Sequence, residues 1–257
     1  MTCPAERLVL GPDEVHVWYV RTPRATDALL LDSYAALLSE EESRRRLRFL
    51  FDRDRHTYLV SRALVRTTLS RYADVAPADW QFVANAHGRP EIVRPAGCPP
   101  LRFNLSHTGG LAAMAVTLLR DVGIDVEDVT RRDVGLRVAE HYFAAGEVAD
   151  LFALPPEEQR RAFFDYWTLK EAYIKARGMG LALPLDAFCM RLRSEQTPRI
   201  EFEPRIDDDP ARWSFHLWRP TSQHTIALAA DRGAATSLAM RIEETLPQRG
   251  LPTRDDS

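Results

Sequence analysis

The sequence runs through strand, helices and strands in the same order twice. A strand-like segment at 15–20 precedes helical segments between residues 39 and 72, and strand-like segments follow between residues 101 and 118. After a division near residue 120, a second strand-like segment at 122–127 again precedes helices and then strands. Helices and strands that come in blocks, not as alternating βα units, predict an α+β fold. The repeated order predicts two similar lobes.

The second half carries the clearest helical and strand-like patterns. Helical patterns lie at 132–142, 146–152 and 157–177, and strand-like segments at 187–192, 200–203, 213–218 and 225–230. A chain of 257 residues is long enough for two modest domains, each with its own core. We therefore expect an N-terminal lobe at 1–120, a C-terminal lobe at 121–246, and a flexible tail at 247–257.

Two helix ends are marked by specific residues. Ser39 stands three residues before Glu42, the spacing of a capping box, and so predicts a helix start. Gly178 and Gly180 follow the last long helical pattern and predict its end, because glycine readily adopts the left-handed conformation beyond a helix.

Composition narrows the classes of function. The net charge of −3 lacks the global positive charge of a nucleic-acid-binding protein. Three widely spaced cysteines without a Cys-x-x-Cys arrangement indicate neither a disulfide framework nor a zinc site. The first ten residues lack a secretory apolar core, and the longest apolar run is too short for a bilayer. We expect a cytoplasmic protein that uses neither nucleic acid nor a membrane.

Two carboxylates alternate with apolar residues in the strand-like segment at 122–127. Successive side chains of a strand point to opposite faces, so Asp125 and Glu127 share one face while Ile124 and Val126 enter a core from the other. On its own such a pattern is typical of a solvated outer face. It is also a candidate seat for a divalent cation.

A third carboxylate lies on the helical segment 157–177. Glu171 and Lys175 are four residues apart and share one helix face, which also suits a surface ion pair. The same segment is rich in aromatic residues, so we expect a largely buried helix, whose charges need partners. Asp125, Glu127 and Glu171 together would offer hard oxygen ligands for Mg²⁺, which usually completes its shell with water and substrate phosphates. The set predicts a phosphate-bearing substrate.

Candidate phosphate contacts occur elsewhere in the chain. Ser106 and His107 follow a short strand and precede two glycines, a turn that offers a hydroxyl, an imidazole and backbone N–H groups. Arg89 projects from a Gly-Arg-Pro turn, and Arg45 and Arg55 come from the first helical region. Arginine suits phosphate because of its forked donors, although an arginine run is often only a solvated helix face.

Four motifs in this order and spacing resemble the 4′-phosphopantetheinyl transferases, in particular the large, two-lobed monomeric type that acts on carrier proteins of nonribosomal peptide and polyketide synthesis. The motifs are Gly88-Arg89-Pro90, Phe103-Asn104-Leu105-Ser106-His107-Thr108-Gly109, Val122-Gly123-Ile124-Asp125-Val126-Glu127 and Trp167-Thr168-Leu169-Lys170-Glu171-Ala172-Tyr173-Ile174-Lys175. The segment Gly178-Met179-Gly180-Leu181, with Pro184, Leu185 and Phe188, is also similar. The similarity spans roughly residues 39–192. Relatives often have Lys at the position of Arg89 and a basic residue near Glu42.

The resemblance implies two lobes related by pseudo-twofold symmetry, and transfer of the 4′-phosphopantetheine group of coenzyme A to a serine of an apo acyl or peptidyl carrier protein. The products are holo carrier protein and 3′,5′-ADP. By position, Asp125, Glu127 and Glu171 would hold Mg²⁺, and Glu171 would also act as base, so that Asp125, Glu171 and Lys175 form the catalytic set. The implied coenzyme A contacts are Arg45, Arg55, Arg89, Ser106, His107, Lys170 and Lys175.

Two other functions are open from the residues alone. A Mg²⁺-dependent phosphohydrolase or nucleotidyltransferase would also use clustered carboxylates and arginines, but would need no protein acceptor. A non-catalytic coenzyme A-binding or carrier-docking module would bind coenzyme A without regard to Mg²⁺.

Overall fold

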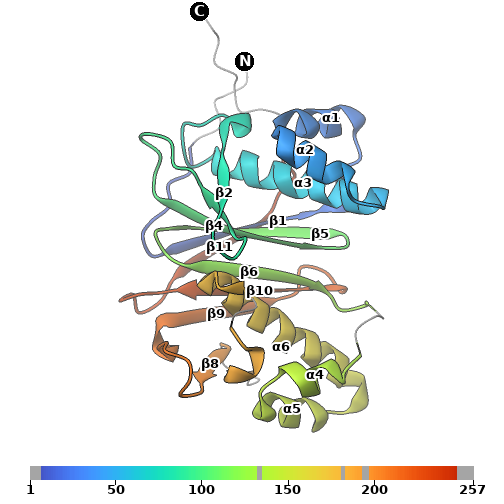
Figure 1. Ribbon diagram of the computed structural model, residues 1–257, viewed down its shortest axis with the longest axis vertical. Coiled ribbons are helices and arrows are strands. Elements are labelled where there is room, and N and C mark those ends of the chain that lie inside the picture. Colours follow the sequence, from blue (N-terminus) through green and yellow to red (C-terminus); the bar gives the residue numbers. More distant parts are fainter. Residues whose placement is uncertain (1–6, 132–134, 181–182, 193–196, 248–257) are drawn as a thin grey trace, which may run out of the picture. The chain divides into compact units, whose positions relative to one another are not determined.

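The computed structural model describes residues 7–131, 135–180, 183–192 and 197–247 (Figure 1). The chain forms two compact units, which are described separately. The first unit comprises Met1–Asn85, Pro90–Leu119 and Met240–Ser257, and the second comprises Ala86–Arg89 and Arg120–Ala239. The expected lobes differ in three places, because 86–89 and Arg120 belong to the second unit and the chain from Met240 onward belongs to the first. Residues 248–257 of the expected tail lie outside the described residues.

The first unit is a four-stranded sheet with helices on one face (Figure 1). Its elements are β1 (Glu14–Arg21), α1 (Ala28–Leu37), α2 (Glu40–Leu47), α3 (Asp52–Leu69), β2 (Phe82–Ala84), β3 (Pro90–Ile92), β4 (Leu101–Thr108), β5 (Leu111–Leu118) and β11 (Ala239–Glu244). The strand order is β11-β1-β5-β4, and β2 and β3 form a separate ribbon. The core lies between α3 and the sheet, where Leu64, Trp18 and Met114 are fully buried.

Helix α2 begins as the capping pattern predicts. The Ser39 hydroxyl accepts a hydrogen bond from the Glu42 backbone N–H, and the Glu42 carboxylate accepts one from the Ser39 N–H at 2.9 Å. Glu42 also accepts from the guanidinium of Arg66 at 2.7 Å, and Arg66 is buried in α3. Glu42 therefore fixes α2 to α3.

The second unit is a three-stranded sheet crossed by one long helix. Its elements are β6 (Val122–Asp128), α4 (Val138–Tyr142), α5 (Ala145–Phe152), α6 (Pro156–Arg177), β7 (Phe188–Arg191), β8 (Arg199–Phe202), β9 (Trp213–Trp218) and β10 (His224–Asp231). The strand order is β6-β10-β9, and β7 pairs with β8. Helix α6 starts at a proline and ends at Gly178, whose φ of 63° is left-handed and whose N–H bonds to the Ile174 carbonyl. The glycine stop is confirmed.

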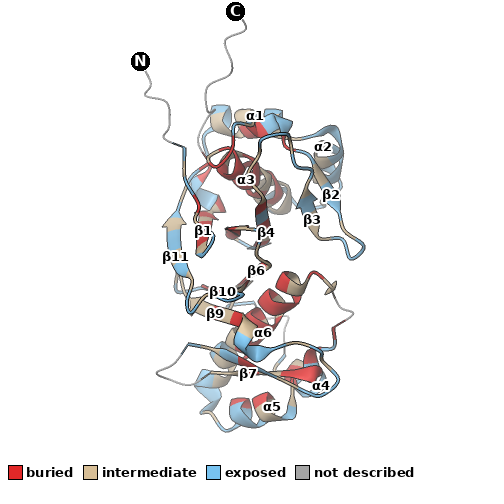
Figure 2. Ribbon diagram, turned by 90° about the vertical axis from the view of Figure 1, so that its left-hand side faces the viewer, coloured by how far each residue is buried: buried red, intermediate tan, exposed pale blue. Residues whose placement is uncertain are grey.

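Both units follow the same chain path. In each, the first strand pairs with the last strand of a hairpin, giving the orders β1-β5-β4 and β6-β10-β9. In each, a long helix follows the first strand, and a two-stranded ribbon separates that helix from the hairpin. Figure 2 shows that both long helices, α3 and α6, carry a buried stripe. The α+β class and the two similar lobes are confirmed.

Three features were not predicted from the sequence: α1, the β2–β3 ribbon and β11. The strand β11 is mostly exposed, and side-chain contacts help fix its position because Glu244 pairs with Arg21 and Arg24 at 2.8 Å. The helix expected at 132–142 is seen as the shorter α4, and residues 132–134 lie outside the described residues. No helix in the described ranges is long and apolar enough to cross a membrane.

Candidate active site

The site is built on a very close contact between β6 and α6. Gly123 faces the helix, and a Cβ atom placed on it would lie 2.0 Å from the carbonyl oxygen of Ala172 and 2.3 Å from the backbone nitrogen of Ala176. No side chain fits such distances. The strand and helix backbones meet because glycine stands on one and alanine on the other.

This contact determines where the strand carboxylates point. Since side chains alternate along a strand, Asp125 and Glu127 lie on the same face of β6 as Gly123, which is the face covered by α6. They lie on the face opposite Ile124 and Val126, as expected, but this face is covered by α6 and is not a solvated outer face. Asp125 is only 4% exposed. A buried carboxylate needs a partner, and α6 supplies one.

That partner is Lys175, whose ammonium donates to the Asp125 carboxylate. Lys175 is four residues beyond Glu171, so both side chains lie on the same face of α6. The prediction that this helix is largely buried is confirmed, because Phe163, Leu169 and Tyr173 are almost completely buried. The charged face of α6 thus points at the strand carboxylates.

The pKa values of the remaining two carboxylates are raised by burial and by nearby negative charge. Burial, followed by the charge of Asp125, raises the pKa of Glu127 to about 7. Burial, again followed by the charge of Asp125, raises the pKa of the Glu171 carboxyl. Lys175 opposes both shifts, and Arg131 lies 3.6 Å from the Glu127 carboxylate. Asp125, Glu127 and Glu171 therefore form a single electrostatic group.

The donor chemistry of this group suits a hard divalent cation, but the side chains are not arranged around one. Within the described residues, no three His, Cys, Asp or Glu side chains converge closely enough to hold a metal ion as they stand. Instead the Lys175 ammonium neutralises Asp125. For a cation to be held here, Asp125, Glu127 and Glu171 would have to turn toward one another.

Lys170 does not lie where the resemblance implies. Its side chain is fully buried, and its ammonium donates to both oxygens of Glu147, at 2.7 and 2.6 Å, and to the Phe188 carbonyl. Glu147 in turn accepts from the backbone N–H groups of Met190 and Ala144. Burial lowers the pKa of Lys170 and raises that of Glu147. An interior ammonium saturated by these acceptors cannot face a diphosphate, so this expectation is corrected.

Arg89 lies at the end of α6. It follows Gly88, which has a φ of 83°, and its guanidinium donates to the carbonyls of Lys175 and Ala176 at 3.3 and 3.0 Å. A cation at the C-terminus of a helix compensates the exposed carbonyls there. Arg89 thus holds the segment 86–89 against the helix turn that contains Lys175.

The other expected contacts belong to the first unit. Ser106 is buried and His107 exposed, both on β4. Arg45 is exposed on α2. Arg55, near the start of α3, donates to the Phe49 carbonyl and pairs with Asp52. The second unit alone contains the carboxylates and Lys175.

Glu147 and Arg131 are the site-related residues that sequence reasoning missed. Arg131 is four residues beyond Glu127, but that spacing indicates a contact only on a helix, and Arg131 follows a strand. Nothing in the sequence links Glu147 to Lys170, which is 23 residues away.

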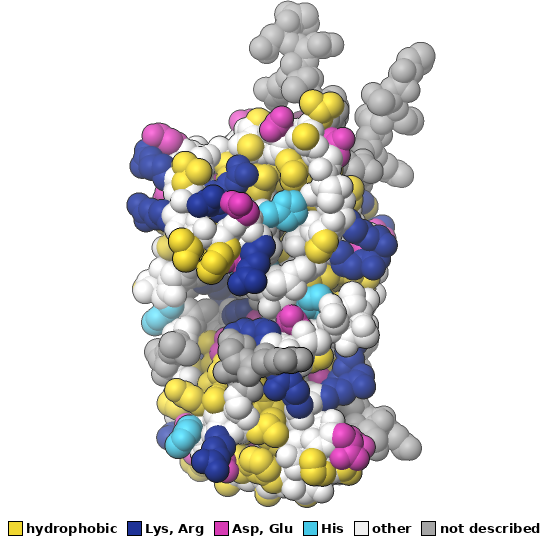
Figure 3. All heavy atoms as spheres, turned by 90° about the vertical axis from the view of Figure 1, so that its right-hand side faces the viewer, with side chains coloured by type: hydrophobic (Ala, Val, Ile, Leu, Met, Phe, Trp, Pro, Cys, Tyr) yellow, Lys and Arg dark blue, Asp and Glu magenta, His cyan; other side chains and the backbone are white. Residues whose placement is uncertain are grey.

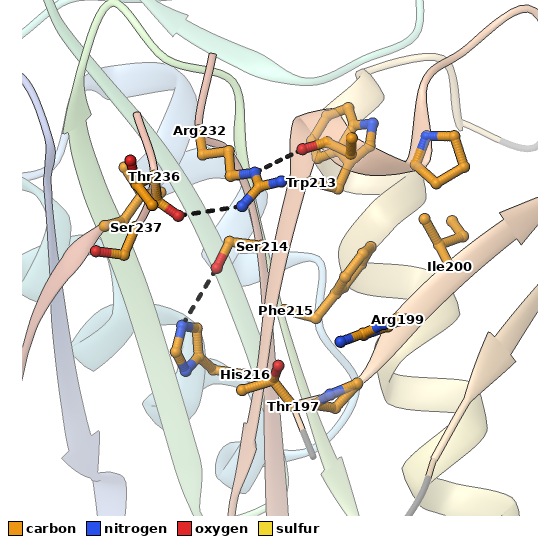
Figure 4. Close-up of a pocket in the computed structure, with 14 residues that line it drawn as sticks. Thr197, Arg199, Ile200, Trp213, Ser214, Phe215, His216, Arg232, Thr236 and Ser237 are labelled. Atoms are coloured by element: carbon orange, nitrogen blue, oxygen red, sulfur yellow. Dashed lines mark hydrogen bonds between the residues drawn. The ribbon is translucent and has the colours of Figure 1, made fainter. Parts of the chain in front are cut away.

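The second unit also contains a separate cavity of about 570 Å³ beside β9 (Figure 4). Its lining includes Trp213, His216 and Arg232. Burial lowers the pKa of His216, and Arg232 is held by the carbonyls of Ala211 and Thr236. None of the residues expected at the active site lines this cavity.

Fold and site together define an α+β enzyme with a buried carboxylate–lysine centre where a strand crosses a long helix. Family models agree with this class. Residues 121–229 match the 4′-phosphopantetheinyl transferase superfamily, and residues 25–118 match the 4′-phosphopantetheinyl transferase N-terminal family.

Individual relatives support the same assignment. The chain is 37% identical over 175 residues to the 4′-phosphopantetheinyl transferase HetI of Nostoc sp., covering 68% of this chain and 73% of the relative. It is 30% identical over 217 residues to the putative 4′-phosphopantetheinyl transferase slr0495 of Synechocystis sp., covering 84% and 83%. The crystal structure of Thermotoga maritima holo-[acyl-carrier-protein] synthase aligns at 24% identity over 47% of this chain and 64% of that one. Its TM-score of 0.35 is too low to support a conclusion.

The chain therefore belongs to the 4′-phosphopantetheinyl transferase superfamily. It is a transferase that moves the phosphopantetheine group of coenzyme A to a carrier protein.

Proposed function

We propose that this enzyme modifies carrier proteins of nonribosomal peptide and polyketide synthesis, and that the β6–α6 contact is its catalytic centre. The observation that carries the proposal is the burial of Asp125 against α6, paired with Lys175 and coupled by charge to Glu127 and Glu171. Burying so much negative charge costs stability, and such perturbed carboxylates cluster at functional sites.

In the proposed reaction, the carrier serine hydroxyl attacks the β-phosphorus of coenzyme A. A new phosphoester forms, the P–O bond to the α-phosphate side breaks, and 3′,5′-ADP leaves while the serine proton passes to a base. Such a displacement depends on positioning and on neutralising the phosphate oxygens. No transfer would take place to an acceptor that does not present a serine hydroxyl.

Glu171 is the proposed base. Burial and Asp125 raise the pKa of its carboxyl, so it holds a proton more readily than an ordinary glutamate does. A base works best when its pKa approaches the working pH. Lys175 is proposed to leave Asp125 for the diphosphate, a move for which its partly exposed side chain is suited.

Asp125, Glu127 and Glu171 are the proposed Mg²⁺ ligands. When bound, Mg²⁺ would supply neutralising charge to the diphosphate oxygens. The fit rests on the donor set, which is three carboxylates in one electrostatic group. A bound cation would oppose the effects of burial and of the Asp125 charge, which raise the pKa of Glu127.

The remaining contacts are proposed from the family pattern. Ser106 and His107 would bind the 3′-phosphate region of coenzyme A, and Arg45 would assist at its phosphates. Arg55 keeps this proposed role only if coenzyme A displaces its contacts to Asp52 and Phe49. Arg89, which donates to the carbonyls of Lys175 and Ala176, would also contact a phosphate.

We further propose that the enzyme acts as a monomer in the cytoplasm, without nucleic acid or membrane as partner. Cys98 and Cys189 are free thiols, which suits a reducing compartment.

The test replaces Asp125 by asparagine, which keeps the shape and removes the charge. Asp125→Asn should abolish the mass increase of an apo carrier protein incubated with coenzyme A and Mg²⁺, and should abolish binding of Mn²⁺ followed by electron paramagnetic resonance. The matched control is Asp128→Asn on the same strand, where the carboxylate accepts hydrogen bonds from Thr130.

Full transfer by Asp125→Asn would refute the catalytic centre. If that variant loses transfer but still binds Mn²⁺ like the wild type, Asp125 is not a metal ligand, and the proposed catalytic centre is retained.

A further inference from the structure

The strand β9 forms one edge of its sheet, and no strand of the described residues pairs with its outer side. The Arg232 N–H donates to the Arg212 carbonyl at 2.9 Å, which marks a hydrogen-bonded pair where β9 begins. In an antiparallel ladder such pairs alternate with pairs that exchange no hydrogen bond. Phe215 lies opposite Ala229, three pairs farther along, and so falls on a non-bonded pair. Its N–H and C=O therefore point outward, away from β10.

The β9 edge lacks the residues that usually protect an edge strand. Charged side chains and proline discourage pairing with another chain. The strand β11, at an edge of the other sheet, carries Arg241, Glu243 and Glu244. By contrast, β9 reads Trp-Ser-Phe-His-Leu-Trp, and burial lowers the pKa of its one histidine, His216, so that the imidazole is neutral at pH 7. The β9 edge is therefore suited to pair with a further extended segment.

The cavity beside β9 leaves this edge open (Figure 4). Residues 213–216 line the cavity, and at roughly 3.3 Å per residue they present about 13 Å of strand. Figure 4 shows Phe215 on one side of the strand, toward Ile200, and Ser214 and His216 on the other. An extended segment of about four residues along β9 would direct its side chains alternately to the apolar and the polar side.

The charged side chains that line the cavity are basic. Arg199 and Arg232 are among the lining residues, and no Asp or Glu of the described chain is. Arg199 is exposed and makes no ion pair within the described ranges, and Arg232 donates to the carbonyls of Ala211 and Thr236. The surface shown in Figure 3 is different, because Lys and Arg side chains lie beside Asp and Glu there.

The acidic residues close to these two arginines in the sequence are paired with other groups. Glu201 accepts from Arg191 at 2.8 Å, and Asp231 accepts from Arg212 at 2.8 Å. The cavity therefore combines unpaired backbone groups with positive charge that no carboxylate of the described residues neutralises.

We propose that the outer edge of β9 binds an extended acidic segment of a partner protein as an added strand. The backbone of the segment would exchange hydrogen bonds with Phe215, and its carboxylates would pair with Arg199 and Arg232. Outward N–H and C=O groups favour a peptide over a small anion, because a peptide backbone repeats donors and acceptors at the spacing of a strand. This surface lies outside the proposed catalytic centre, and the inference does not depend on the proposed function.

A second copy of this chain fits the edge less well. Antiparallel pairing of two β9 strands about a twofold axis would bring Arg199 and Arg232 of one copy close to the same arginines of the other. The resulting like-charge repulsion opposes self-association through this edge.

The first test measures binding of a fluorescein-labelled, capped peptide of alternating valine and aspartate by fluorescence anisotropy. Arg199→Glu should weaken binding about tenfold or more, because it replaces attraction by repulsion. Arg137→Glu is the matched control, since it makes the same charge change at an exposed arginine that does not line the cavity. Added salt should weaken binding to the wild type.

A second pair of variants blocks the cavity without a change of charge. Ser237→Trp places a large side chain in the lining and should abolish peptide binding. Ser222→Trp, in the exposed turn between β9 and β10, should bind like the wild type. Circular dichroism must show the same folded state for all variants, and both Arg199→Glu and Ser237→Trp should retain wild-type transfer to a carrier protein.

Pairing of backbones is tested with two further peptides, N-methylated either at the valines or at the aspartates. Only one set of N–H groups can face β9, so one of the two peptides should lose binding and the other should keep it. The unmodified peptide should also slow hydrogen exchange at the Phe215 N–H.

The proposal fails if the peptide shows no saturable binding up to about 1 mM, or if a peptide with lysine in place of aspartate binds equally well. It fails if both N-methylated peptides bind like the parent, since the backbone would then not be paired. It also fails if light scattering shows a wild-type dimer that Ser237→Trp dissociates. Binding is measured without coenzyme A or carrier protein, so a wild type that binds the peptide but transfers nothing would overturn the proposed function only.

Discussion

Gly123 decides whether the catalytic carboxylates can meet α6, and Gly123→Ala tests this directly. The new Cβ would lie 2.0 Å from the Ala172 oxygen and 2.3 Å from the Ala176 nitrogen. Ordinary contact needs more than about 3.2 Å, so strand and helix must separate by roughly 1 Å. Both obstacles are backbone atoms, which cannot rotate away.

The shift has two measurable costs. Forcing a methyl group into a packed interior destabilises the folded protein by about 1–3 kcal/mol. Replacing glycine also reduces the conformational entropy of the unfolded chain, which offsets less than about 1 kcal/mol of this cost. For a chain of this size, each kcal/mol lowers Tm by about 2–4 °C, so Tm should fall by several degrees. A 1 Å displacement of Lys175 and Glu171 from Asp125 should lower kcat by about 100-fold.

The assay is thermal unfolding by circular dichroism beside single-turnover transfer to an apo carrier protein. Gly135→Ala is the matched control, because open space surrounds that glycine and its φ is not left-handed. Wild-type Tm and kcat in Gly123→Ala would show that β6 and α6 do not pack as described, and would refute the reasoning.

Three further outcomes are expected. Lys170→Met should lower the free energy of unfolding, measured by urea denaturation, by about 3–5 kcal/mol, because Glu147 stays buried without its cation. The double variant Lys170→Met/Glu147→Gln should recover part of this loss. No recovery would contradict the pairing of Lys170 with Glu147. Because burial raises the pKa of Glu127 to about 7, folded protein keeps a proton that the unfolded chain, with a pKa of 4.5, releases. The free energy of unfolding of the wild type should therefore decline as the pH rises between these values. Relative to the wild type, metal-free Glu127→Gln should become more stable by up to about 3 kcal/mol from pH 4.5 to 8. Parallel stability curves for the two proteins would contradict the raised pKa of Glu127. Ser39→Ala should cost about 1 kcal/mol in thermal melts, and an unchanged Tm would show that the capping box is not formed in solution.

Part of the active site was predictable from local pattern. The spacing of Glu171 and Lys175 places them on one helix face whatever surrounds the helix, and the aromatic content of 157–177 correctly indicated burial. The direction of the strand carboxylates was not predictable. Alternation separates the two faces of β6, but it does not say which face α6 covers or how deeply Asp125 is buried.

The direction of the Lys170 side chain was also not predictable from the sequence. It is adjacent to Glu171 in sequence, yet a helix turns about 100° per residue, so neighbours point in different directions. Lys170 therefore enters the core to meet Glu147, while Glu171 stays with Asp125.

Apart from α1, the β2–β3 ribbon and β11, the sequence by itself determined the order of strands and helices. It also determined the capped start of α2, the glycine end of α6 and the motifs of the family, because each depends on residues close together in the chain. Only the tertiary structure decided that Gly123 admits the backbone of α6, that Lys175 neutralises Asp125, and that Lys170 belongs to Glu147. Those pairings join residues 23 to 50 positions apart. Their partners are selected by packing, which no local pattern encodes.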